Sequence, residues 1–213
     1  MFFNQKHSME ITPNQNKAVN DIVELIVATI GDESREIDTT DAISTTARLA
    51  GSFLYRSFGF KITDAKPGTA MLSEEANTKG PELLNLTFLV LQNYGIQLDN
   101  TKMSGGNPKK AESDFVEVIR KVQTRALEIM KNQELSYEQM AQSAAIATAF
   151  IIQQSSNITP EEGFGTAVYH YIEGTKTFPP AFDHEAEELV NENNPVSEKE
   201  KADDGFKPWW KLW

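Results

Sequence analysis

Cysteine is absent from the 213 residues of this sequence. Its absence excludes disulfide bonds, thiolate nucleophiles and cysteine-ligated zinc or iron–sulfur centres. Histidine is scarce, and none of His7, His170 and His184 has a glutamate three residues before it or a second histidine four residues away. The helical di-iron and zinc motifs need such pairs. We therefore expect neither a metal nor another cofactor.

The familiar catalytic signatures are also missing. There is no Gly-x-x-x-x-Gly-Lys phosphate loop, no Gly-x-Ser-x-Gly nucleophile elbow and no Asp-rich calcium loop. Gly163-Phe164-Gly165 lacks the third glycine of a dinucleotide fingerprint and falls inside a predicted helix. These absences favour a protein that is not an enzyme.

Long apolar runs and an excess of positive charge are lacking too. The longest apolar stretches, Ile22–Ile30 and Ala144–Ile152, fall short of the roughly 18–20 residues of a membrane span. No apolar segment typical of a secretory signal follows Met1. The formal charge is −11, whereas nucleic-acid binding needs a basic surface. We expect a cytoplasmic protein that binds neither nucleic acid nor membranes. Its partner would be another protein, and a basic surface on that partner would complement the acidic charge of this chain.

What the sequence does contain is helical periodicity with clear start signals. Ile11-Thr12-Pro13 and Ile158-Thr159-Pro160 each place a capping threonine before a proline, and Ser136 begins a capping box. We expect helices at Pro13–Ile30, Thr40–Phe58, Pro81–Tyr94 and Ala111–Asn132, after Ser136, and from Pro160 to about Gly174. The pattern predicts an all-α fold, a single bundle of about six helices over residues 11–182, between an N-terminal extension (1–10) and a tail (183–213).

Two finer expectations concern particular helices. The leucine-rich helix that begins at Pro81 has little polar face, which favours a central position with burial on most sides. Gly31 is expected to end the first helix as a left-handed cap.

A row of small residues on the last predicted helix allows two interpretations. Its members are Gly163, Ala167, His170 and Gly174. A close helix crossing explains the glycines, each of which costs about 1 kcal/mol in a helix interior, and is the interpretation we favour. The alternative is a small-ligand-binding or enzymatic bundle with a pocket near this sixth helix. Its polar groups would be His170, Glu173, Tyr171 and Tyr55.

The tail differs in composition from the rest of the chain. Residues 183–205 hold nine acids against two lysines, and all three tryptophans lie within the last five positions. Tryptophan is enriched at binding hot spots, because it buries a large rigid area. The octapeptide Phe206–Trp213 is expected either to dock on a partner or to fold back over an apolar gap of the bundle. Its contacting residues would be Phe206, Trp209, Trp210, Leu212 and Trp213.

Taken together, the sequence favours a non-enzymatic protein–protein interaction module, adaptor- or immunity-like, that uses an acidic surface and this tryptophan-rich peptide. The alanine-rich helix after Ser136 fits an internal core or a dimer interface equally well, so a homo-oligomer stays open.

Overall fold

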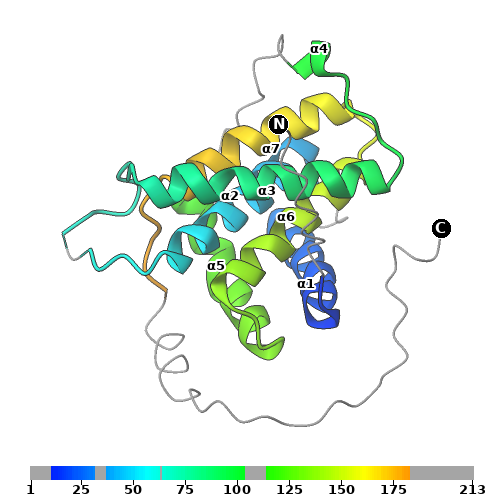
Figure 1. Cartoon of the computed structure of the whole chain (residues 1–213). Coiled ribbons are helices and arrows are strands. Elements are labelled where there is room, and N and C mark those ends of the chain that lie inside the picture. Colours follow the sequence, from blue (N-terminus) through cyan, green and yellow to red (C-terminus); the bar gives the residue numbers. More distant parts are fainter. Residues whose placement is uncertain (1–10, 32–36, 63, 104–113, 183–213) are drawn as a thin grey trace.

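A computed structural model describes residues 11–31, 37–62, 64–103 and 114–182, and these residues form an all-helical bundle (Figure 1). The six long helices are α1 (Pro13–Ile30), α2 (Thr39–Ser57), α3 (Glu74–Asn93), α5 (Phe115–Asn132), α6 (Tyr137–Gln154) and α7 (Pro160–Thr175), and α4 (Asn100–Met103) is a single turn. Strand pairing within the described ranges is limited to one isolated antiparallel bridge between Ala70 and Thr177. The predicted all-α fold is confirmed. The extension 1–10 and the tail 183–213 lie outside the described residues.

The predicted helix starts are confirmed at three positions. Thr12, Ser136 and Thr159 each begin a capping box, in which the cap side chain accepts a backbone N–H three residues on and that residue's side chain accepts the N–H of the cap. These reciprocal bonds satisfy amide groups that the helix itself leaves without partners. Local sequence therefore determines where α1, α6 and α7 begin.

Two predictions about helix termini are wrong: the start of the third long helix and the conformation of the Gly31 cap, although Gly31 does end α1. The third long helix begins at Glu74, seven residues before Pro81, with Ser73 as its cap. Pro81 is tolerated inside α3 because Asn77, whose carbonyl loses its helical partner, is exposed, so water can satisfy that carbonyl. Gly31 has φ −71°, so α1 ends in an extended cap and not in a left-handed one.

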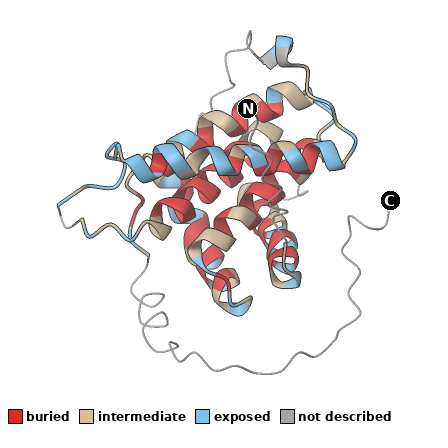
Figure 2. Ribbon diagram, in the orientation of Figure 1, coloured by how far each residue is buried: buried red, intermediate tan, exposed pale blue. Residues whose placement is uncertain are grey.

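Two helices, α2 and α6, form the centre of the bundle. α1 and α5 pack against them on one side, and α3 and α7 pack on the other (Figure 1). The expectation that the leucine-rich helix is central is wrong, because the outer face of α3 is exposed and Leu89 keeps 53% of its surface in solvent (Figure 2). By contrast, all residues of α2 from Ala42 to Tyr55 are buried.

The central helices are rich in small and hydroxyl-bearing residues. Thr46 Oγ1 donates to the Ala42 carbonyl at 2.7 Å, and Thr148 Oγ1 donates to the Ala144 carbonyl at 2.8 Å. Such bonds to the preceding turn satisfy a hydroxyl without a partner from another helix. Buried threonines on α2 and α6 therefore act as small packing residues and allow the neighbouring helices to approach closely.

The chain that follows α7 is held against α2 and α5 by side-chain hydrogen bonds. We call residues 176–182 the C-terminal strap. Arg56 of α2 donates to the Pro180 carbonyl at 2.7 Å and lies 4.0 Å above the Phe182 ring. Gln123 of α5 donates to the Ala181 carbonyl at 2.7 Å and accepts from Arg56 at 2.7 Å. These contacts therefore hold the last described residues against α2 and α5.

Replacing Gln123 with alanine is expected to lower the free energy of unfolding by about 1–3 kcal/mol, because it leaves Arg56 and a strap carbonyl with unmet hydrogen bonds. Urea denaturation monitored by circular dichroism measures the change. The matched control is Gln92→Ala on the exposed face of α3, for which we expect a change within about 0.5 kcal/mol. Equal effects at the two positions would contradict the role of Gln123.

Candidate functional site

Gly174, the last member of the small-residue row of α7, lies at a close crossing with α2, and a close helix crossing is the interpretation that the row favoured. A Cβ atom added to Gly174 would lie 2.6 Å from the Arg48 carbonyl oxygen, and one added to Gly51 would lie 2.7 Å from the Thr175 backbone nitrogen. Both distances are far shorter than ordinary van der Waals contact. The backbones of α2 and α7 therefore touch where these glycines meet, and no side chain fits between them.

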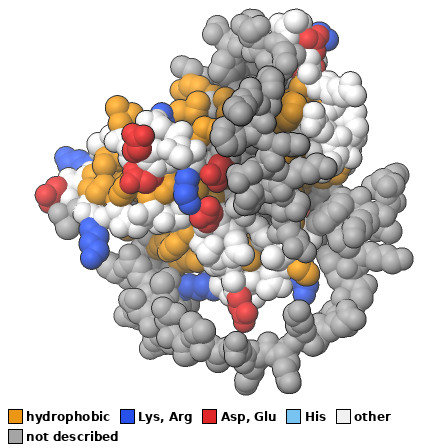
Figure 3. Space-filling model, viewed as in Figure 1, with side chains coloured by type: hydrophobic (Ala, Val, Ile, Leu, Met, Phe, Trp, Pro, Cys, Tyr) orange, Lys and Arg blue, Asp and Glu red, His pale blue; other side chains and the backbone are white. Residues whose placement is uncertain are grey.

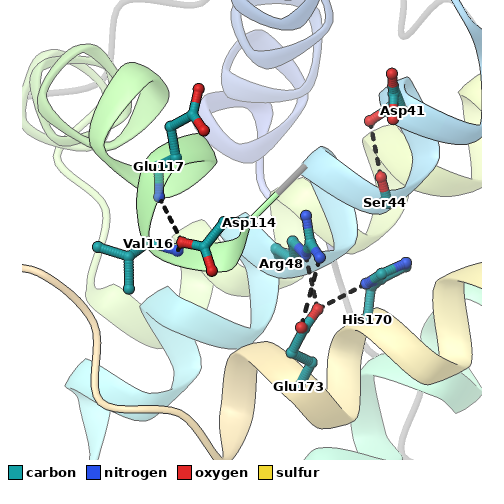
Figure 4. Close-up of polar contacts among 8 residues, drawn as sticks. All are labelled: Asp41, Ser44, Arg48, Asp114, Val116, Glu117, His170 and Glu173. Carbon is teal, nitrogen blue, oxygen red and sulfur yellow. Dashed lines mark hydrogen bonds and ion pairs between the residues drawn. The ribbon is translucent and has the colours of Figure 1, made fainter. Parts of the chain in front are cut away.

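A charged cluster lies beside this crossing (Figure 4). Arg48 of α2 donates from Nε to Glu173 Oε2 at 2.7 Å and from Nη2 to Oε1 at 3.4 Å. His170, one turn before Glu173 on α7, contacts the same Oε2 with Nδ1 at 2.7 Å. The carboxylate therefore accepts hydrogen bonds from both helices and ties α2 to α7.

The surroundings of Glu173 keep it ionised. Burial by itself raises the pKa of a carboxyl group, but the hydrogen bonds from His170 and Arg48 and the charge of Arg48 outweigh it, so the pKa of Glu173 is lowered. The Arg48 side chain is 4% exposed and His170 is fully buried, whereas the Glu173 side chain keeps 25% of its surface in solvent. The cluster is an ion pair enclosed within a helix interface.

The four candidate catalytic residues do not form one site. His170 and Glu173 are in contact, but the Tyr171 hydroxyl lies between α3 and α6, 2.7 Å from Thr87 Oγ1, where burial raises its pKa. The Tyr55 ring packs in an aromatic cluster with Phe58, Phe60 and Phe178 near the end of α2. A substrate could not contact these groups together.

The geometry of the His170 cluster favours a structural role. Its imidazole is fully buried beside a crossing at which two backbones touch, and its Nδ1 is engaged with Glu173. Within the described part of the chain, no group of three or more histidine, aspartate or glutamate side chains could hold a metal ion. The same residues include no helix long and apolar enough to cross a membrane.

A groove lies instead between α1 and α5, which we call the α1–α5 groove. It has a volume of about 450 Å³, within the range of roughly 300–1,000 Å³ that is usual for ligand sites. Its lining comes from Asp21, Glu24, Leu25 and Ala28 of α1, and from Arg125, Glu128, Ile129 and Asn132 of α5 together with Gln133. Gln133 donates to Asp21 at 3.3 Å and bridges the two sides at one end.

Sequence reasoning missed this groove. The exposed neighbours of the buried Leu25 on α1 include Asp21 and Ala28, and Glu128 is the exposed neighbour of Ile129 on α5. Each helix carries an ordinary amphipathic pattern, and only their antiparallel packing brings the two acidic edges together. The five tail residues predicted to bind a partner, Phe206, Trp209, Trp210, Leu212 and Trp213, lie outside the described residues.

Comparison with protein-family models, with curated proteins and with solved structures finds no match to this chain. The described residues form an all-helical bundle with an acidic, partly apolar surface groove between α1 and α5.

Proposed function

We propose that this chain is a cytoplasmic protein–protein interaction module without enzymatic activity of its own, adaptor- or immunity-like, and that the α1–α5 groove binds a basic, aromatic-bearing segment of its partner. The observation that carries the proposal is that apolar and acidic side chains line the same groove, and we call these two sets its floor and its rim. Stable interfaces combine these two features, with an apolar centre for affinity and a polar rim for specificity.

The floor of the groove supports an aromatic anchor. Leu25, Ala28 and Ile129 supply its apolar surface, and Ala28 is itself exposed. Aromatic side chains are the common hot-spot residues of interfaces, because a rigid ring buries much area at a small cost in conformational entropy. One or two such rings fit the volume of the groove.

The rim supports a basic partner. Asp21, Glu24 and Glu128 outnumber Arg125, so the groove carries a net negative charge, as does the chain as a whole at −11. Complementary charge accelerates association and disfavours acidic competitors. The side of the bundle that bears α3 is more mixed, with apolar side chains between acidic and basic ones (Figure 3).

A charge reversal in the groove tests this function. Proteins captured from a native lysate by the full chain are identified, and the affinity of the principal one for purified variants is then measured. Glu128→Lys is expected to weaken binding about tenfold, which corresponds to about 1.4 kcal/mol of like-charge repulsion at the rim. The control is Glu82→Lys on the exposed face of α3, which makes the same charge change away from the groove. Equal affinities of the two variants would contradict the proposal.

A further inference from the structure

The α1–α5 groove and the end of the same chain have complementary chemistry. The octapeptide Phe206–Trp213 contains three tryptophans and two lysines and has no acidic side chain. The groove has an apolar floor and an acidic rim that includes Asp21 and Glu128. We propose that the octapeptide binds in the α1–α5 groove of its own chain and competes there with the partner. This inference rests on the proposed function of the groove.

The charge pattern of the tail selects the octapeptide over the residues before it. Residues 183–205 carry nine acids and two lysines, so the acidic rim repels them. Within the tail, only the octapeptide combines positive charge with aromatic rings that the floor can take. The change from negative charge in residues 183–205 to positive charge in the octapeptide therefore directs the octapeptide to the groove and keeps the preceding stretch away from it.

The fold holds the last described residues, just before the tail, close to the groove. The Ala181 carbonyl is held by Gln123, and Ile129 of the groove lies six residues further along α5, about 9 Å at 1.5 Å per residue. The 23 residues from 183 to 205 span up to about 75 Å when extended. The octapeptide can therefore reach the groove from any direction around α5.

Covalent attachment makes even a weak contact effective. A linker of this kind gives an effective concentration on the order of 1 mM. A separate octapeptide with a dissociation constant of about 100 µM would then occupy the groove of its own chain about nine-tenths of the time. A partner that needs the same groove would bind the wild-type chain about tenfold more weakly than a chain whose octapeptide cannot compete.

Tryptophan fluorescence tests the contact directly, because Trp209, Trp210 and Trp213 are the only tryptophans in the chain. The full-length protein is expected to give a blue-shifted emission that is protected from acrylamide. Ala28→Arg fills the groove and repels the two lysines, so the emission should shift to the red and quenching should rise. Ala28 is exposed, so the substitution leaves the bundle folded. Asn85→Arg on the exposed face of α3 adds the same charge away from the groove and should behave as wild type.

At a single protein concentration, two fluorescence results would overturn the inference. One is emission from the wild-type protein that is as red and as quenchable as that of the synthetic octapeptide. The other is protection that persists in Ala28→Arg. Dilution distinguishes binding of the octapeptide to the groove of its own chain from binding to the groove of a second chain. Protection of the tryptophans from acrylamide does not depend on protein concentration when the contact lies within one chain. Protection that disappears on dilution would assign the contact to a second copy and overturn the inference.

The competition itself is tested with the partner. The full-length chain carrying Trp209→Ala, Trp210→Ala and Trp213→Ala is expected to bind the partner about tenfold more tightly than wild type. Unchanged binding would overturn the competition, and weaker binding would show that the octapeptide contacts the partner itself. The proposed function fails separately: it fails if Glu128→Lys and Glu82→Lys bind the partner equally in a chain that also carries the three tryptophan-to-alanine changes, where the octapeptide no longer competes, whatever the fluorescence shows.

Discussion

Replacing Gly174 with alanine is expected to lower the free energy of unfolding by about 3 kcal/mol, near the upper end of the cost of overpacking. The new Cβ would lie 2.6 Å from the Arg48 carbonyl oxygen and 3.0 Å from the Gly51 Cα. Both of these are backbone atoms, so no rotamer change relieves the contact. α2 and α7 would have to move apart, and the packing beside the crossing would loosen with them.

The same helix offers a control of opposite sign. A Cβ added to Gly165 meets no atom within 4 Å, so Gly165→Ala is expected to stabilise the protein by about 0.5–1 kcal/mol through helix propensity alone. Gly163→Ala should fall between the two, since its Cβ would lie 3.1 Å from the Ile152 side chain, which can adjust. Urea denaturation of the three variants gives the ranking. A Gly174→Ala protein as stable as wild type would show that the crossing is looser than the structure has it.

The contrast between these glycines shows which features sequence alone can predict. The capping boxes at Thr12, Ser136 and Thr159 are local, so the starts of three helices followed from three or four residues each. The row of small residues predicted a close crossing for the same reason. It could not distinguish Gly174, which touches the backbone of α2, from Gly163, where an added Cβ would meet the side chains of Ile152 and Ile158, because that difference depends on the neighbouring elements.

Which helices are the most buried was harder to predict from the sequence. Hydrophobicity placed the leucine-rich α3 at the centre, but α2 holds that position with serines, threonines and glycine buried along its length. A hydropathy pattern measures polarity, whereas close packing at a crossing depends on side-chain size and on whether each hydroxyl can bond within its own helix. The α1–α5 groove was not predicted for a related reason, because it is formed by the edges of two helices that lie about a hundred residues apart in the sequence.

The second large effect concerns the charged cluster at the α2–α7 crossing. Glu173→Gln removes the charge that compensates Arg48, whose side chain is 4% exposed. Breaking a buried ion pair from one side costs about 3–5 kcal/mol. Because Glu173 keeps a quarter of its side chain in solvent, we expect a smaller loss, about 2–3 kcal/mol at pH 7. The double variant with Arg48→Met and Glu173→Gln should lose about 1–2 kcal/mol less unfolding free energy than the sum of the losses of the two single variants.

The pH dependence of stability distinguishes this ion pair from simple packing. The folded-state pKa of Glu173 lies below its ordinary value of 4.5, so the unfolded state binds the proton more readily. Its contribution is therefore fully present above about pH 4.5 and is lost as the pH falls through the lower folded-state pKa. We expect the difference in unfolding free energy between wild type and Glu173→Gln to be constant from pH 7 to about pH 5 and to shrink below that. Urea denaturation at pH 7, 5 and 3.5 measures it. A difference that persists unchanged at pH 3.5 would mean that shape, and not the charge of Glu173, holds α2 against α7.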